Sequence, residues 1–175
     1  LGFGVFLAVW MGIGLHLPEM GYGVDIVGYL AAFSILNLFT TPWLGKVADN
    51  IGPYRARLIF ASINFAGVCL LWPMGYNVWL LIIPIMLMTL VGPAVDITNR
   101  MTFLKLDPKI RTRLMTVYIV MMFIGGGISS SAGTAVYDAF GWSGNAVLAI
   151  VMTALLTALC AVGWVWKGRG TAGIG

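Results

Sequence analysis

Two pairs of polar residues stand out in a chain that is otherwise apolar. Asp96 and Arg100 are four residues apart, so on a helix they share one face and are expected to pair. Ser34 and Asn37 lie about one turn apart on one helical face. A hydroxyl and an amide placed in this way either contact a bound solute or hydrogen-bond between helices, the latter being worth about 1 kcal/mol or less.

Residues suited to covalent or metal chemistry are sparse. An enzyme site at membrane depth needs a nucleophile with a base, or a set of metal ligands. The chain has one histidine, His16, and two well-separated cysteines, Cys69 and Cys160, which we interpret as small apolar residues. The serines at Ser129–Ser131 have no candidate base. We therefore predict no enzyme activity, no catalytic residue, no metal and no cofactor.

The composition is that of a membrane protein. Of 175 residues, 60% are hydrophobic and only 9% are charged, whereas soluble domains are about a quarter charged. Such a chain cannot cover a water-facing surface, which excludes a soluble domain and a disordered chain. Its formal net charge of +4 is expected to orient it in a bilayer and not to bind nucleic acid. The first residue is Leu1 and not Met, so we expect a piece of a longer chain.

Long stretches without charge predict the elements that must position these residues. A bilayer core takes roughly 20 residues of helix, and the stretch Leu58–Val95 is long enough to cross twice. The turn-forming residues Trp72–Asn77 divide it. The sequence thus predicts an all-α membrane protein with six transmembrane helices. They lie at about 1–17, 26–44, 58–73, 78–97, 114–136 and 143–166.

The basic residues all fall on one side of this predicted topology. The opposite connections carry only the acids Glu19, Asp25 and Asp138. Positive charge accumulates on the cytoplasmic side of membranes, so we predict a multi-pass protein of the cell membrane with both ends cytoplasmic. The ten basic residues are Lys46, Arg55, Arg57, Arg100, Lys105, Lys109, Arg111, Arg113, Lys167 and Arg169.

The fifth predicted span is rich in small residues. Gly125, Ser129 and Gly133 recur every four residues, and a second row of Gly126, Ser130 and Thr134 lies beside them. Small residues let helices approach closely where lipid offers no hydrophobic driving force. Two adjacent rows predict a central helix that neighbours approach on more than one side.

The turn between the second and third predicted spans carries a distinct pattern. Gly45 is expected to permit a close helix approach, and Gly52 to form the bend together with the proline that follows it. Asp49 could pair with Arg55 or Arg57, or face the N-terminus of a neighbouring helix. Such a contact would latch this end of the bundle, and the alternative is a solvated turn.

This pattern resembles the signature hairpin of the major facilitator superfamily, which lies between the second and third helices of each six-helix half. The matching residues are Gly45-x-x-Ala48-Asp49-x-x-Gly52-x-x-Arg55. A second stretch resembles the last three helices of bacterial drug-efflux-type members: it runs from Asn99-Arg100 through Gly125–Gly127 to Phe140-Gly141-Trp142. The resemblance implies the C-terminal half of a twelve-helix transporter in a bacterial inner membrane.

The resemblance also implies an activity. Two halves would rock about a site near mid-membrane and move a small organic solute by alternating access. An ion gradient would drive efflux or antiport, because the chain has no nucleotide-binding loop. The solute contacts expected on the cavity-lining helices are Trp10, Ser34, Asn37 and Tyr118. The expected cytoplasmic gating motif is Gly45, Asp49, Gly52 and Arg55, and Asp96 with Arg100 is either a structural pair or an inner gate.

The expected partners are a small-molecule solute, the lipid bilayer and the missing N-terminal six-helix half, with no nucleic acid. Asn64, in the third span, is expected to lie at the periphery and to serve packing. The spans hold no ionisable residue at mid-depth, so a titrating carboxylate is expected in the other half. The alternatives are a non-transporting membrane subunit or a channel formed by self-association.

Overall fold

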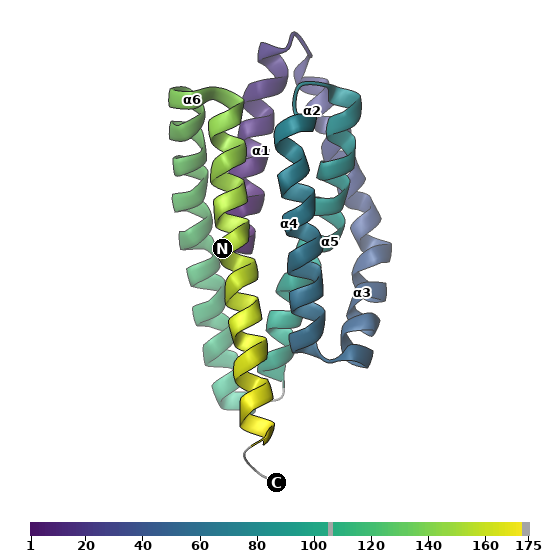
Figure 1. The fold of residues 1–175 in the computed structure, drawn as a ribbon, viewed down its shortest axis with the longest axis vertical. Coiled ribbons are helices and arrows are strands. Elements are labelled where there is room, and N and C mark those ends of the chain that lie inside the picture. The colour runs from purple at the N-terminus through teal and green to yellow at the C-terminus, as the bar shows by residue number, and fades with distance from the viewer. Residues whose placement is uncertain (105–106, 173–175) are drawn as a thin grey trace.

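The computed structural model of the protein describes residues 1–104 and 107–172. Lys105, one of the ten basic residues counted in the sequence, lies outside the described residues, and so do the side chains of Lys167 and Arg169. Every element in the described part is a helix, and the helices lie side by side in an elongated bundle (Figure 1).

The helices follow the predicted apolar stretches closely. α2 and α3 are joined by a short 3-10 turn, η1, into one continuous helical segment, Asp25–Ile51. Five helical segments of the described chain are long and apolar enough to cross a membrane. The elements are α1 (Gly2–Glu19), α2 (Val24–Ala32), η1 (Phe33–Leu36), α3 (Asn37–Ile51), α4 (Pro53–Met74), α5 (Val78–Leu104) and α6 (Pro108–Ala172).

The longest helix, α6, contains both of the last two predicted spans. It is interrupted at Gly141, whose φ of 64° and ψ of −155° are not helical. These torsions belong almost exclusively to glycine. There α6 turns and returns beside itself as two antiparallel arms (Figure 1), which bring the Asn145 side chain within 3.3 Å of the Gly133 carbonyl. We call residues 108–140 the first arm and residues 142–172 the second arm.

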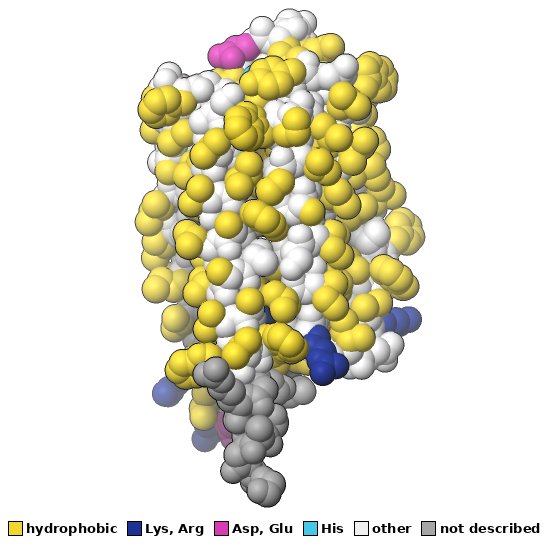
Figure 2. Space-filling view, in the orientation of Figure 1, with side chains coloured by type: hydrophobic (Ala, Val, Ile, Leu, Met, Phe, Trp, Pro, Cys, Tyr) yellow, Lys and Arg dark blue, Asp and Glu magenta, His cyan; other side chains and the backbone are white. Residues whose placement is uncertain are grey.

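The two ends of the bundle differ in charge. The Lys and Arg side chains visible in Figure 2 gather at its lower end, where α3 turns into α4 and α5 leads to α6. We call this the basic end. The opposite end is called the acidic end, because Glu19 ends α1 there, Asp25 lies in the first turn of α2, and Asp138 lies next to the Gly141 bend of α6 (Figure 1). Leu1 lies part-way along the bundle, while α6 ends at the basic end (Figure 1). The compartment that each end faces stays a prediction.

The interior of the bundle is mostly apolar, and its outer surface also carries many apolar side chains. Val5, Val9 and Ile13 form a stripe on α1 that is buried in one cluster with Leu81 and Ile85 of α5. A second cluster, nearer the basic end, joins α3, α4, α5 and the second arm of α6. Many large apolar side chains are nevertheless exposed, as expected for a surface that meets lipid tails instead of water.

Small residues fit α1 against the first arm of α6, but not in the predicted rows. A Cβ on Gly133 would lie 3.1 Å from the Cα of Ala8, and one on Gly126 would lie 2.8 Å from the ring of Phe3. Within the part of the chain that the structure describes, nothing lies within 4 Å of a Cβ on Gly125, so its predicted role in close packing is wrong there. The packed face is Gly126, Ser129 and Gly133, because a helix of 3.6 residues per turn alternates steps of three and four.

Candidate functional site

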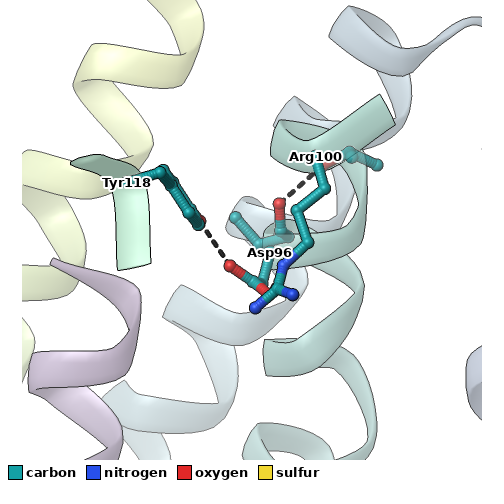
Figure 3. Close-up of polar contacts among 5 residues, drawn as sticks. Asp96, Arg100 and Tyr118 are labelled. Atoms are coloured by element: carbon teal, nitrogen blue, oxygen red, sulfur yellow. Dashed lines mark hydrogen bonds and ion pairs between the residues drawn. The ribbon is translucent and has the colours of Figure 1, made fainter. Parts of the chain in front are cut away.

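The best-defined polar cluster surrounds the carboxylate of Asp96 on α5. The Tyr118 hydroxyl, on the first arm of α6, donates a hydrogen bond to Oδ1 of Asp96. On the other side, Nε of Arg100 donates to Oδ2 at 2.7 Å. Figure 3 shows the carboxylate lying between these two donors. The ion pair expected from the four-residue spacing is therefore formed, and Tyr118 completes it from another helix.

Aromatic contacts fix the tyrosine of this cluster. The Phe103 ring meets the Tyr118 ring edge-on, with centroids 5.6 Å apart. The guanidinium of Arg100 lies 5.9 Å from the centroid of Tyr118, within the range of a cation–π contact. Tyr118 is thus held by both its hydroxyl and its ring, which ties α5 to α6 near the basic end.

The cluster forms part of the wall of a cavity of about 480 Å³. A cavity of this size suits a small organic molecule. Asn64 of α4 also lines it; this side chain is only 4% exposed, and no described residue forms a hydrogen bond with its Oδ1. The sequence led us to expect Asn64 at the periphery, and the structure instead buries it beside this cavity. The other lining residues are mostly apolar and include Phe3, Phe6, Met88, Met121, Met122 and Leu156.

The structure places one of the four expected solute contacts at this cavity. Tyr118 lines it, whereas Trp10, Ser34 and Asn37 do not. Trp10 packs against Phe6, with ring centroids 6.1 Å apart, and its Nε1 is buried without a partner. Asn37 follows directly after η1, and its Oδ1 is likewise buried without a partner. Among the described residues, neither of these two buried polar atoms has a hydrogen-bond partner.

The predicted hairpin has its bend where expected. Gly52 has a φ of 87°, and Pro53 begins α4 at the first helical position. Gly45 meets nothing within 4 Å, so its predicted close helix approach is wrong for the described residues. Asp49 and Arg55 are both exposed, and among the described residues neither forms a hydrogen bond or an ion pair. The hairpin is unlatched in this structure.

A different contact joins this hairpin to α5. Arg57, the fifth residue of α4, donates from Nη1 to Oδ1 of Asn99 at 2.8 Å. Its guanidinium also lies over the Tyr54 ring, 4.9 Å from the centroid. Asn99 stands one residue before Arg100, so the Arg57 contact reaches the same turn of α5 as the Asp96 cluster. The sequence showed these residues but gave no sign of their pairing, which depends on how the two helices are rotated.

Asn145 is a second residue that sequence reasoning missed. It is fully buried on the second arm of α6, and its amide donates to the carbonyls of Ala8 and Gly133 at 3.1 and 3.3 Å. A Cβ on Gly12 would lie 2.4 Å from its Oδ1. The sequence signal that could have identified Asn145 is its position as the single asparagine near the start of the last apolar span. No group of three or more potential metal ligands occurs in the described part of the chain.

The comparisons with known proteins fit this geometry. Residues 1–173 match the sequence pattern of the Major Facilitator Superfamily. The chain belongs to the Major Facilitator Superfamily. Membership in this superfamily places the apolar helices of the bundle in a membrane and groups the chain with transporters rather than enzymes.

Two named relatives of this superfamily chain come from Escherichia coli. The chain is 26% identical to the putative uncharacterized transporter YgaY of strain K12 and to the uncharacterized transporter YgaY of strain O157:H7, over 170 residues in each case. The match covers 96% of this chain and 42% of each relative, so the chain spans less than half their length. No solved structure matches the chain.

Proposed function

We propose that the chain is the C-terminal six-helix half of a drug-efflux-type transporter in the inner membrane of a bacterium, with its basic end in the cytoplasm. It moves a small organic solute by alternating access. A solute or ion gradient drives the transport as efflux or antiport, since no nucleotide-binding loop occurs in the sequence. The observation that carries the proposal is the cavity of about 480 Å³ whose wall contains the pair of Asp96 and Arg100 within mostly apolar helices. Ionisable groups in such helices are costly and mark solute or ion pathways.

The partner in this proposal is a second, N-terminal half. The match to only 42% of the length of the YgaY proteins supports it. So does the apolar surface of the first arm of α6, where Met121, Phe123 and Ile128 are all more than half exposed. In a twelve-helix arrangement such a face would meet the other half, and the remaining exposed apolar side chains would meet lipid.

The chemistry of the cavity wall points to an apolar or aromatic solute. Three methionines and two phenylalanines supply a soft, polarizable lining. The unpartnered Oδ1 of Asn64 offers a single acceptor for a polar group of the solute. Arg100 already balances the charge of Asp96, so the wall carries little net charge to attract a strongly ionic compound.

Gating in this proposal belongs to the basic end. Asp96 with Arg100, joined by Tyr118, would hold α5 against α6 while this end is closed. The hairpin residues Gly45, Asp49, Gly52 and Arg55 lie at the same end, and their exposed charges are available to another part of the protein. Trp10, Ser34 and Asn37 serve as solute contacts in a conformation in which the two halves enclose them.

The test is transport by the full-length protein in vesicles, measured as uptake and efflux over a panel of organic solutes. Asn37→Ala should change the profile if the free amide contacts solute, and Tyr118→Phe should lower transport of the same compounds by removing the bond to Asp96. Tyr29→Phe is the matched control, because Tyr29 is 73% exposed. A profile unchanged in Asn37→Ala removes this residue from the site, and a protein that moves no solute of the panel counts against the proposal.

A further inference from the structure

A network of hydrogen bonds at the acidic end joins three parts of the bundle. Nε2 of His16, on the last turn of α1, lies 3.1 Å from the carbonyl oxygen of Gly75, in the turn after α4. Nδ1 of the same ring lies 3.3 Å from the hydroxyl of Tyr137 on the first arm of α6. That hydroxyl in turn donates to Oε2 of Glu19 at 2.5 Å.

Counting hydrogens shows that all three contacts can be hydrogen bonds at the same time only if the network holds an extra proton. The Gly75 carbonyl only accepts, so Nε2 of His16 must carry a hydrogen. The single hydrogen of the Tyr137 hydroxyl is used by Glu19, so Nδ1 must also donate, which makes the ring an imidazolium. In the other arrangement Glu19 is protonated and donates to Tyr137, whose own hydrogen turns to Nδ1. Both arrangements hold one proton more than a neutral imidazole with an ionised carboxylate.

Burial of the ring opposes a positive charge on it, and two features of its surroundings stabilise that charge. His16 is 7% exposed and stacks on the Trp142 ring, with centroids 4.5 Å apart and planes 13° from parallel, where a cation gains from the face of the indole. It also lies at the C-terminal end of α1, the negative end of the helix dipole. Gly75 permits the stack, because a Cβ there would lie 1.8 Å from Nε1 of Trp142.

The charged and titratable groups around the ring agree with a neutral, proton-bound cluster. Glu19 faces it from α1, Tyr137 from α6, and the ring of Tyr76 from the turn after α4 at 6.2 Å. Asp25 and Asp138 are at the same end, but within the described residues neither bonds to the cluster. The carboxylate of Glu19 therefore balances an imidazolium, as a buried charge requires. Glu19 is exposed, so the hydrogen-bonded network extends from the buried ring to the surface of the bundle.

We propose that His16, Tyr137 and Glu19 form a proton-binding site, and that the bound proton completes the connection from α1 to α6 and the turn after α4. When the proton leaves, lone pairs on Nδ1 and on the Tyr137 oxygen face each other and that contact is lost. A ligand that binds only the assembled state stabilises it. The acidic end is thus held more tightly at low pH than at high pH.

Substitution of Glu19 by Gln tests this directly in the full-length protein. The amide of Gln can donate to the Tyr137 oxygen, whose hydrogen then serves Nδ1 of a neutral His16, so the network is complete without the extra proton. In the native protein Tm should fall as the pH rises from about 5 to about 8, the range in which histidine titrates. In Glu19→Gln the high-pH loss should be absent. Asp138→Asn, an exposed acid outside the network, should keep the native slope.

A second measurement observes the ring itself. The ¹⁵N signals of His16, assigned by their absence in His16→Gln, should titrate over the same pH range in the native protein and stay those of a neutral ring in Glu19→Gln. Tyr137→Phe should remove the pH dependence of Tm at a lower overall stability; if it does not fold, the Glu19→Gln result still decides. Equal Tm slopes in the native protein and Glu19→Gln overturn the proposal, as does an identical titration of His16 in both.

Discussion

Tyr118 and Tyr137 lie on the same arm of α6, and each donates its hydroxyl to a carboxylate on a different helix. Tyr118 bonds to Asp96 of α5 near the basic end, and Tyr137 bonds to Glu19 of α1 at the acidic end. At 1.5 Å per residue the two tyrosines are about 28 Å apart along the helix. Between them the arm packs on α1 through small residues. The arm is therefore fastened by polar contacts at both ends and by close packing in between.

Replacing Asp96 by Asn in the full-length protein should leave proton coupling in place. The ion pair with Arg100 is about a third exposed on both sides, so its loss should cost no more than about 1 kcal/mol. The variant should therefore express and fold. The measurement is solute-induced proton movement in vesicles, with the exposed acid variant Asp25→Asn as the control. Loss of that movement at normal expression would show that Asp96 itself carries the proton.

Replacing Gly12 by Ala should destabilise the bundle, because the new Cβ would lie 2.4 Å from Oδ1 of the buried Asn145. Overpacking of this kind costs about 1–3 kcal/mol. Gly14→Ala is the matched control, since nothing lies within 4 Å of that position and alanine is the better helix former by about 1 kcal/mol. Thermal unfolding of the purified full-length variants compares the two.

The same clash predicts a coupling between the two residues. Asn145→Ala alone should be destabilising, because it removes two hydrogen bonds to the backbone. In the Asn145→Ala background, Gly12→Ala should destabilise the bundle far less than it does in the native protein. Effects that simply add in the double variant would show that the two side chains do not meet.

Replacing Gly52 by Ala should destabilise the hairpin between α3 and α4. Gly52 has φ 87° and ψ 143°, a region in which other residues are strained by about 1–3 kcal/mol. Gly45→Ala, seven residues earlier in the same motif, lies in a helix with open space around it and should be neutral or slightly stabilising. We expect a lower Tm for Gly52→Ala than for Gly45→Ala. Equal Tm values would show that position 52 does not require the positive φ that only glycine adopts easily.

Labelling should place the basic end in the cytoplasm. Lys46 and Lys109 are exposed there, and Asp138 is exposed at the acidic end. Single Cys variants at the first two positions should react with a membrane-impermeant thiol reagent only after the cells are opened, and one at Asp138 should react in intact cells. The native protein, with its free cysteines Cys69 and Cys160, gives the background level of labelling. External labelling at Lys46 or Lys109 would reverse the proposed orientation.

The sequence by itself determined the features that depend on neighbours along the chain. Long apolar runs must be helices in a membrane, so the helical segments follow from composition. The bend at Gly52 and the pairing of Asp96 with Arg100 are equally local, since a turn needs a permissive residue and a helix brings residues four apart onto one face.

Only the tertiary structure decided which faces meet. The rotation of each apolar helix is set by packing against its neighbours, and an apolar sequence with a similar composition all round does not specify it. The first arm of α6 therefore packs on α1 through Gly126, Ser129 and Gly133, and not through the predicted row that contains Gly125. The partners of Tyr118 and His16 lie on other helices, where the spacing of residues along the chain carries no information about contact.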